Sequence, residues 1–173
     1  MSKLLLALLT GTSLIAMSLN TTAAEKMGQT KAEHNAAKAR ADADYNASRA
    51  LCKALSGNDR DVCVQTAKAA RSKAKAEAEA NFEGTGEAKL EAREEIIDAD
   101  YKVAIEGCDS LAGDAKDVCV AEAKAAYAKE NAALEAREKS MAADYKVAIE
   151  RCGTLSRTAR KSCLQDAKTK FDD

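Results

Sequence analysis

The stretch from Tyr101 to Lys124 reads YKVAIEGCDSLAGDAKDVCVAEAK, and the chain repeats its pattern twice more. Tyr45 to Lys68 reads YNASRALCKALSGNDRDVCVQTAK, and Tyr145 to Lys168 reads YKVAIERCGTLSRTARKSCLQDAK. In each copy a Tyr precedes the first Cys by seven residues, a second Cys follows eleven residues later, and a Lys stands five residues after that. A repeat of this length predicts a supersecondary unit that recurs along the chain.

Each repeat predicts a helix, a tight turn and a second helix. Steps of four, three and three residues place four side chains of the second repeat on one helical face: Tyr101, Ile105, Cys108 and Leu111. Gly113 then offers a left-handed helix stop, and Asp114 can cap the helix that follows. In the first repeat Gly57 takes the same place, with Asn58 or Asp59 as the cap.

The two cysteines of a repeat are predicted to lie opposite each other. Cys52 lies five residues before Gly57 and Cys63 six after it, so at ~1.5 Å of rise per residue both stand about 8–9 Å from the turn. Six cysteines allow fifteen pairings, so the connectivity stays open at this point, and the equal heights favour pairing within each repeat. The predicted disulfides are Cys52–Cys63, Cys108–Cys119 and Cys152–Cys163.

Helix breakers define how the repeats are joined. Gly84 and Gly86 are predicted to end one helix and begin the next. The third turn, Ser156-Arg157-Thr158, has no Gly at the matching position, so we expect it to be looser, with Ser156 or Thr158 as the cap. Residues 25 to about 35 are expected to be frayed. The predicted helices span residues 28–56, 59–82, 87–112, 114–155 and 158–171.

The composition predicts an all-α fold. The chain has no Pro and no Trp, and Ala, the best helix former, is abundant. Because Ala buries little area, a thick core is not expected. The predicted architecture is therefore a set of elongated antiparallel helical hairpins or a staggered bundle, with each hairpin stapled by a disulfide.

The N-terminal residues have the pattern of a cleaved signal peptide. Lys3 precedes an apolar run, Leu4 to Met17, that is too short to span a bilayer, and Thr22-Ala23-Ala24 supplies small residues for cleavage before Glu25. Export favours disulfides over thiols, which predicts a periplasmic or secreted protein without a transmembrane segment in the mature chain. The predicted organisation is a signal peptide at 1–24, a leader and first hairpin at 25–82, and hairpins two and three, sharing a long helix, at 83–173.

The residues that bear chemistry predict no catalytic, cofactor or metal site. A soft-metal site is the alternative for the cysteines, but C-x-x-C spacing is absent and exported thiols oxidise. His34, the single histidine, stands in a polar segment and is expected to be solvated. The Asp-Ala-Asp-Tyr elements at 42–45 and 98–101 could hold calcium or transfer protons, but two Asp at i,i+2 on a helix point apart, so we expect solvent-facing Asp and packed Tyr.

The charge balance argues against nucleic acid as a partner. The formal net charge is −1 at pH 7, and no basic face stands out. We expect the partners to be other envelope proteins or further copies of this chain, engaged through helix packing.

The repeat, with its D-V-C-V sequence and E-A-K-A ending on an Ala/Lys/Glu-rich background, resembles small exported proteobacterial proteins labelled TolA-like or cell-envelope proteins. The likeness covers nearly the whole chain after residue 24. True TolA also carries a membrane anchor and a separate C-terminal domain, which this sequence does not resemble. The resemblance implies a location and a style of fold, and it implies no activity.

Three functions are consistent with these features. The leading hypothesis is a non-catalytic structural or protein-interaction protein of the cell envelope. A periplasmic stress chaperone or holdase is the alternative, which would use exposed apolar patches. Metal or thiol buffering is a further alternative that would need free cysteines.

Overall fold

The computed structural model describes residues 29–172, and that part of the chain is helical, without strands. The all-α prediction is thus confirmed, and the signal-peptide prediction lies outside the described residues. The five helices are α1 (Lys31–Cys52), α2 (Gly57–Glu83), α3 (Gly86–Cys108), α4 (Asp114–Gly153) and α5 (Arg157–Asp172).

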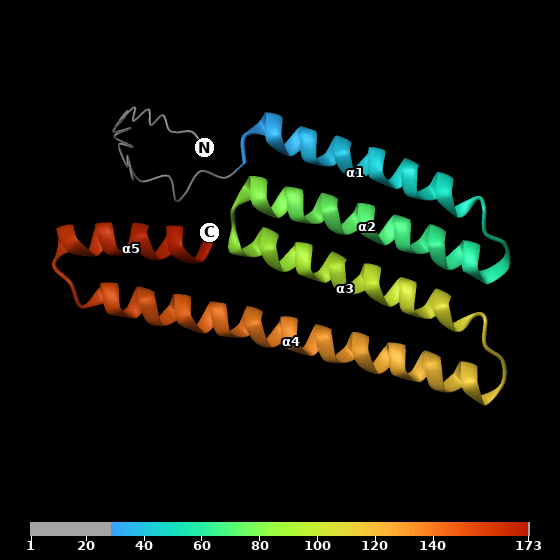
Figure 1. The fold of residues 1–173 in the computed structure, drawn as a ribbon. Helices are drawn as coiled ribbons and strands as arrows, with labels where there is room; N and C mark the ends of the chain where they lie inside the picture. The colour runs from blue at the N-terminus through green and yellow to red at the C-terminus, as the bar shows by residue number, and fades with distance from the viewer. Residues whose placement is uncertain (1–28, 173) are drawn as a thin grey trace, which may run out of the picture.

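The helices form a single antiparallel layer. Figure 1 shows α1 to α4 side by side, each running back along the one before it, and α5 folded back onto the C-terminal half of α4. Each of α1 to α4 packs on its neighbours in sequence, and α5 packs on α4 with a small contact to α3. Stapled hairpins, one of the two predicted arrangements, therefore describe the fold, and they lie flat instead of closing into a bundle.

The buried apolar side chains are small, which explains the flat arrangement. Within residues 29–172 they are ten alanines, three cysteines and one large aliphatic residue, Ile97. Ala80, Ala88 and Ala92 form a buried cluster between α2 and α3. Helices that meet through alanine approach closely, but their side chains do not fill a thick interior.

The first two corners share one design. Helix α1 ends at Cys52 and α3 at Cys108, a few residues before the predicted ends, because the chain then tightens into turns in which the Leu55 and Leu111 amides donate to the carbonyls of those cysteines (3.1 and 3.0 Å). Gly113 has a φ of 55° and is itself the N-cap of α4, without a side-chain cap bond. The expectation that Asp114 caps this helix is therefore wrong, because Gly113 already takes the cap position. The expected caps Asn58 and Asp59 are wrong as well, because the N-cap of α2 is Ser56.

The third corner has no glycine at the matching position, and an arginine side chain bonds to its carbonyls instead. Helix α4 runs unbroken for 40 residues, as predicted, and ends at Gly153. Arg160 of α5 reaches back and donates to the Gly153 carbonyl at 2.5 Å and to the Leu155 carbonyl at 3.4 Å. Carbonyls at a helix C-terminus lack partners within the helix, and a cation there satisfies them.

The junction between α2 and α3 follows the sequence prediction. Gly84 has a φ of 70° and its amide donates to the Ala80 carbonyl at 2.9 Å, which ends α2. Thr85 then caps α3 by accepting from the Ala88 amide at 3.1 Å. Two residues thus reverse the chain direction.

The start of α1 is more ordered than the sequence indicated. Thr30 and Glu33 form a capping box, in which the Glu33 amide donates to the Thr30 hydroxyl and the Glu33 carboxylate accepts from the Thr30 amide. The expectation of fraying over residues 25 to about 35 is therefore wrong from Lys31 onward, because this reciprocal cap satisfies free amides of the first turn, and its first residues, 25–28, lie outside the described part of the chain.

Candidate functional site

The six predicted cysteines form the three predicted disulfides. Their Cα atoms are 5.6 Å apart in Cys52–Cys63, 5.7 Å in Cys108–Cys119 and 5.5 Å in Cys152–Cys163. These distances fall within the usual ~5.5–6 Å. The equal-height argument therefore predicted the connectivity correctly.

The bridges do not come together into one site. The first two lie at the same end of the layer, and the third lies at the far end of α4 (Figure 1). The first cysteine of each pair is almost completely buried. No cysteine of the described chain is free, and residues 29–172 contain no group of three or more His, Cys, Asp or Glu side chains placed to hold a metal ion. Each bridge therefore acts on its own hairpin.

His34 is buried, and the expectation of a solvated histidine is wrong. Its side chain stacks on Phe82 with ring centroids 4.6 Å apart, and its Nε2 lies 2.9 Å from the Glu79 carboxylate. Lys38 donates to the same carboxylate at 3.1 Å. Bonds from Lys38 and then His34 hold the pKa of Glu79 below its ordinary value. The histidine joins α1 to α2, and although the hairpin of these two helices was predicted, the local sequence did not reveal that the histidine lies between them.

The first Asp of each Asp-Ala-Asp element lies at a helix seam. Asp42 is paired with Lys75, at 2.7 Å, and with Arg71, and these bonds lower the pKa of Asp42. Asp98 accepts from the Tyr127 hydroxyl at 2.8 Å, a bond that raises the pKa of Tyr127. The expectation that these Asp face only solvent is wrong, because the neighbouring helix supplies donors to each.

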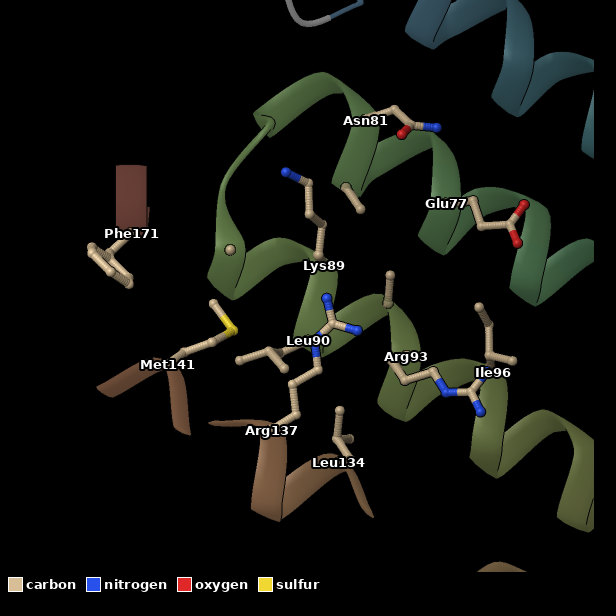
Figure 2. Close-up of a pocket in the computed structure, with 13 residues that line it drawn as sticks. Glu77, Asn81, Lys89, Leu90, Arg93, Ile96, Leu134, Arg137, Met141 and Phe171 are labelled. Atoms are coloured by element: carbon tan, nitrogen blue, oxygen red, sulfur yellow. The ribbon is translucent and has the colours of Figure 1, made fainter. Parts of the chain in front are cut away.

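A groove that the sequence did not reveal opens where α3, α4 and α5 meet, next to the end of α2. Its volume is about 700 Å³. Apolar groups make up one part of its lining: Ala80, Gly86, Leu90, Ala92, Ile96, Leu134, Met141 and Phe171. Polar and charged groups complete it: Glu77, Asn81, Lys89, Arg93 and Arg137. Figure 2 shows Leu90 facing Arg137 and Met141, with Phe171 beyond Met141.

Three cations border this groove, and they differ in their partners. Arg93 donates to Glu130 at 2.5 Å, and Lys89 donates to the Gly84 carbonyl at 3.0 Å. Arg137 is exposed and makes no ion pair or hydrogen bond through its side chain within the described chain. No local motif indicated this site because its walls come from four helices.

Among the helices described here, none is long and apolar enough to cross a membrane. Comparisons with protein-family models, with curated proteins and with solved structures found no match to this chain.

Proposed function

We propose that this chain is an exported, non-catalytic interaction protein of the cell envelope, which reaches the periplasm through removal of residues 1–24. Three disulfides support an oxidising location, since such bonds persist in exported proteins and are rare in the cytosol. The resemblance to TolA-like envelope proteins agrees with this location.

The observation that carries the proposal is the single-layer architecture with one bridge beside the turn of each repeat. Helices packed almost entirely on their sequence neighbours form one layer, so a short chain offers a long contact surface. Each bridge ties together the two helices of its own repeat. Such a surface suits the docking of helices or folded partners without a large ordering cost.

The corners carry the apolar side chains most suited to contact. The Leu that follows the first Cys of each repeat by three residues is exposed in all three copies, at 43% for Leu55, 41% for Leu111 and 41% for Leu155. An isolated exposed Leu is ordinary, but the same Leu at the same turn of three repeats forms a recurring feature.

Site-specific photo-crosslinking in cells tests the proposal. A crosslinking residue is placed in turn at Leu55, Leu111 and Leu155, and at exposed Ala132 and Ala136 in the middle of α4 as controls. We expect the corner positions to give the same discrete adducts with envelope proteins, and the controls to give weaker adducts or none. Recovery from the cytosol, or a chain that keeps residues 1–24, would contradict the proposed location. N-terminal sequencing should begin at Glu25.

A holdase is the second candidate, favoured by exposed apolar side chains near the disulfide corners. Leu51 is 76% exposed and Val118 57%. An aggregation-suppression assay separates the two candidates, because a holdase protects unrelated unfolding proteins in proportion to its amount, whereas an interaction protein does not. Metal or thiol buffering would require reduction of the bridges, since all six cysteines are bonded to one another.

A further inference from the structure

We propose that the groove between α3, α4 and α5 binds a single-chain anionic amphiphile, such as a long-chain carboxylate. The apolar floor would hold the chain, and Arg137 would hold the carboxylate. This site is separate from the corner surfaces of the interaction proposal, and neither depends on the other.

The size and lining of the groove fit a small amphiphile. Its ~700 Å³ falls within the ~300–1,000 Å³ typical of small-molecule sites. The floor contains large apolar side chains: Leu90, Ile96, Leu134, Met141 and Phe171. Methionine in particular adapts to chains of differing shape. The buried apolar side chains of the described residues are mostly alanine, whereas these larger groups line an open space.

The positively charged side chains around the groove favour an anionic ligand. Arg137, Lys89 and Arg93 border the groove against one acid, Glu77, which lies on α2 (Figure 2). Arg93 is already paired with Glu130 across the α3–α4 seam. Arg137 is the cation whose guanidinium has no partner within residues 29–172. A guanidinium binds a carboxylate through two parallel hydrogen bonds, and it does so more strongly where the neighbouring surface is apolar.

The wall formed by α5 depends on the third bridge. Phe171 belongs to the last turn of α5, which packs mainly on α4 and touches α3 only slightly. Cys152–Cys163 ties the start of this helix to the end of α4. Loss of the bridge should therefore loosen one wall of the groove while the α1–α4 layer stays in place.

Fluorescence titration tests the site with defined probes. Dansyl-labelled undecanoate is added to the oxidised protein below its aggregation concentration, and dodecanoate, dodecanol and dodecylamine compete for it. We expect saturable binding with one site per chain, displacement by dodecanoate, weaker displacement by dodecanol and the weakest by dodecylamine. Equal displacement by the cationic and anionic chains would overturn the proposal, because charge would then play no part.

Variants locate the site. Arg137→Ala should weaken dodecanoate binding about tenfold, equivalent to ~1.4 kcal/mol, and leave dodecanol binding unchanged. Arg40→Ala, an exposed arginine on α1, is the matched control and should change neither. Met141→Glu, which places a carboxylate in the floor, should weaken binding of dodecanoate and dodecanol, and circular dichroism checks that each variant stays folded. The absence of saturable binding, or an equal effect of Arg40→Ala and Arg137→Ala, would show that no such site exists.

Discussion

Tyr101 of α3 packs against Tyr127 of α4, with ring centroids 4.6 Å apart. The same relationship recurs in the other hairpins at the same spacing along the chain. The Arg71 guanidinium lies over the Tyr45 ring at 5.3 Å, and Phe171 packs against Tyr145 at 5.6 Å. The repeated Tyr thus has a planar partner on the second helix of every repeat, and the partner differs chemically each time.

The Tyr127 hydroxyl should contribute to stability through its bond to Asp98. Tyr127→Phe keeps the ring contact and leaves the half-buried carboxylate without this donor, so we expect a loss of about 1 kcal/mol in the free energy of unfolding. Urea denaturation measures it. Tyr145→Phe is the matched control, because no hydrogen bond of the Tyr145 hydroxyl is described and little change is expected. Equal losses in the two variants would contradict this role for Asp98.

The same bond should be visible in the titration of the four tyrosines. Asp98 accepts from the neutral phenol and its charge opposes ionisation, so the pKa of Tyr127 is raised. Absorbance of tyrosinate should show one residue that ionises at higher pH than the rest. Asp98→Asn should bring that ionisation back toward the others.

Ile97 should matter more than its neighbour Ile96. Both residues lie on α3. The Ile97 side chain is only 4% exposed, whereas the Ile96 side chain is half-buried at the groove. Ile97→Ala should destabilise the protein by ~2–4 kcal/mol, and Ile96→Ala by clearly less. Ile97→Ala leaves a buried cavity, whereas the space left by Ile96→Ala is open to solvent. Chemical unfolding of both variants checks the order. A larger loss of stability in Ile96→Ala than in Ile97→Ala would contradict the burial assigned to these two side chains.

Acid should weaken the α1–α2 seam. Asp42 and Glu79 have pKa values below their ordinary 3.8 and 4.5 because cations on the facing helix favour the charged form. A depressed folded-state pKa adds stability above the unfolded pKa, and that stability disappears as the pH falls through the folded-state value. The protection of the α1 amides, measured relative to the intrinsic exchange rate at each pH, should therefore fall below about pH 4.

A double variant supplies the control for this effect. Asp42→Asn with Glu79→Gln removes both titrating groups, so α1 should be less protected at pH 7 and should respond less to acid. An unchanged acid response in the double variant would mean that other carboxylates govern the seam.

The bridges should differ in importance according to their place in the layer. Each closes a short loop, which stabilises by roughly 3 kcal/mol in the chain-entropy model. Replacing Cys108 and Cys119 with Ala affects a hairpin with neighbours on both sides, so we expect a larger fall in melting temperature than from the same change at Cys152 and Cys163, which frees mainly α5. Thermal circular dichroism compares the two.

Full reduction extends this test to the whole chain. We expect a strongly lowered and broadened melting transition, because the core consists mainly of alanine and typical domain stability is only ~5–15 kcal/mol. Part of the helical signal should survive through intrinsic propensity. Equal melting temperatures before and after reduction would show that packing alone is sufficient.

The sequence by itself determined the helices, the positions of the corners and the bridges. Each depends on residues close together along the chain, such as Gly84 at a helix end or Cys108 and Cys119 at equal distance from a turn. The unbroken α4 was equally predictable, because no helix breaker stands between Asp114 and its end near Gly153. Local backbone preferences and side-chain spacing were sufficient for these features.

Only the tertiary structure decided which faces meet. The spacing of Tyr101 and Cys108 indicated the face that meets the hairpin partner, but alanine elsewhere on these helices marked no second packing face, so the flat layer could not be distinguished from a bundle. Several features depend on contacts between different helices. They are the burial of His34, the pairing of Asp42, the role of Arg160 and the groove around Arg137. Such contacts are set by the relative placement of whole helices. Alanine-rich helices can pack closely in more than one arrangement, so their sequence does not select one.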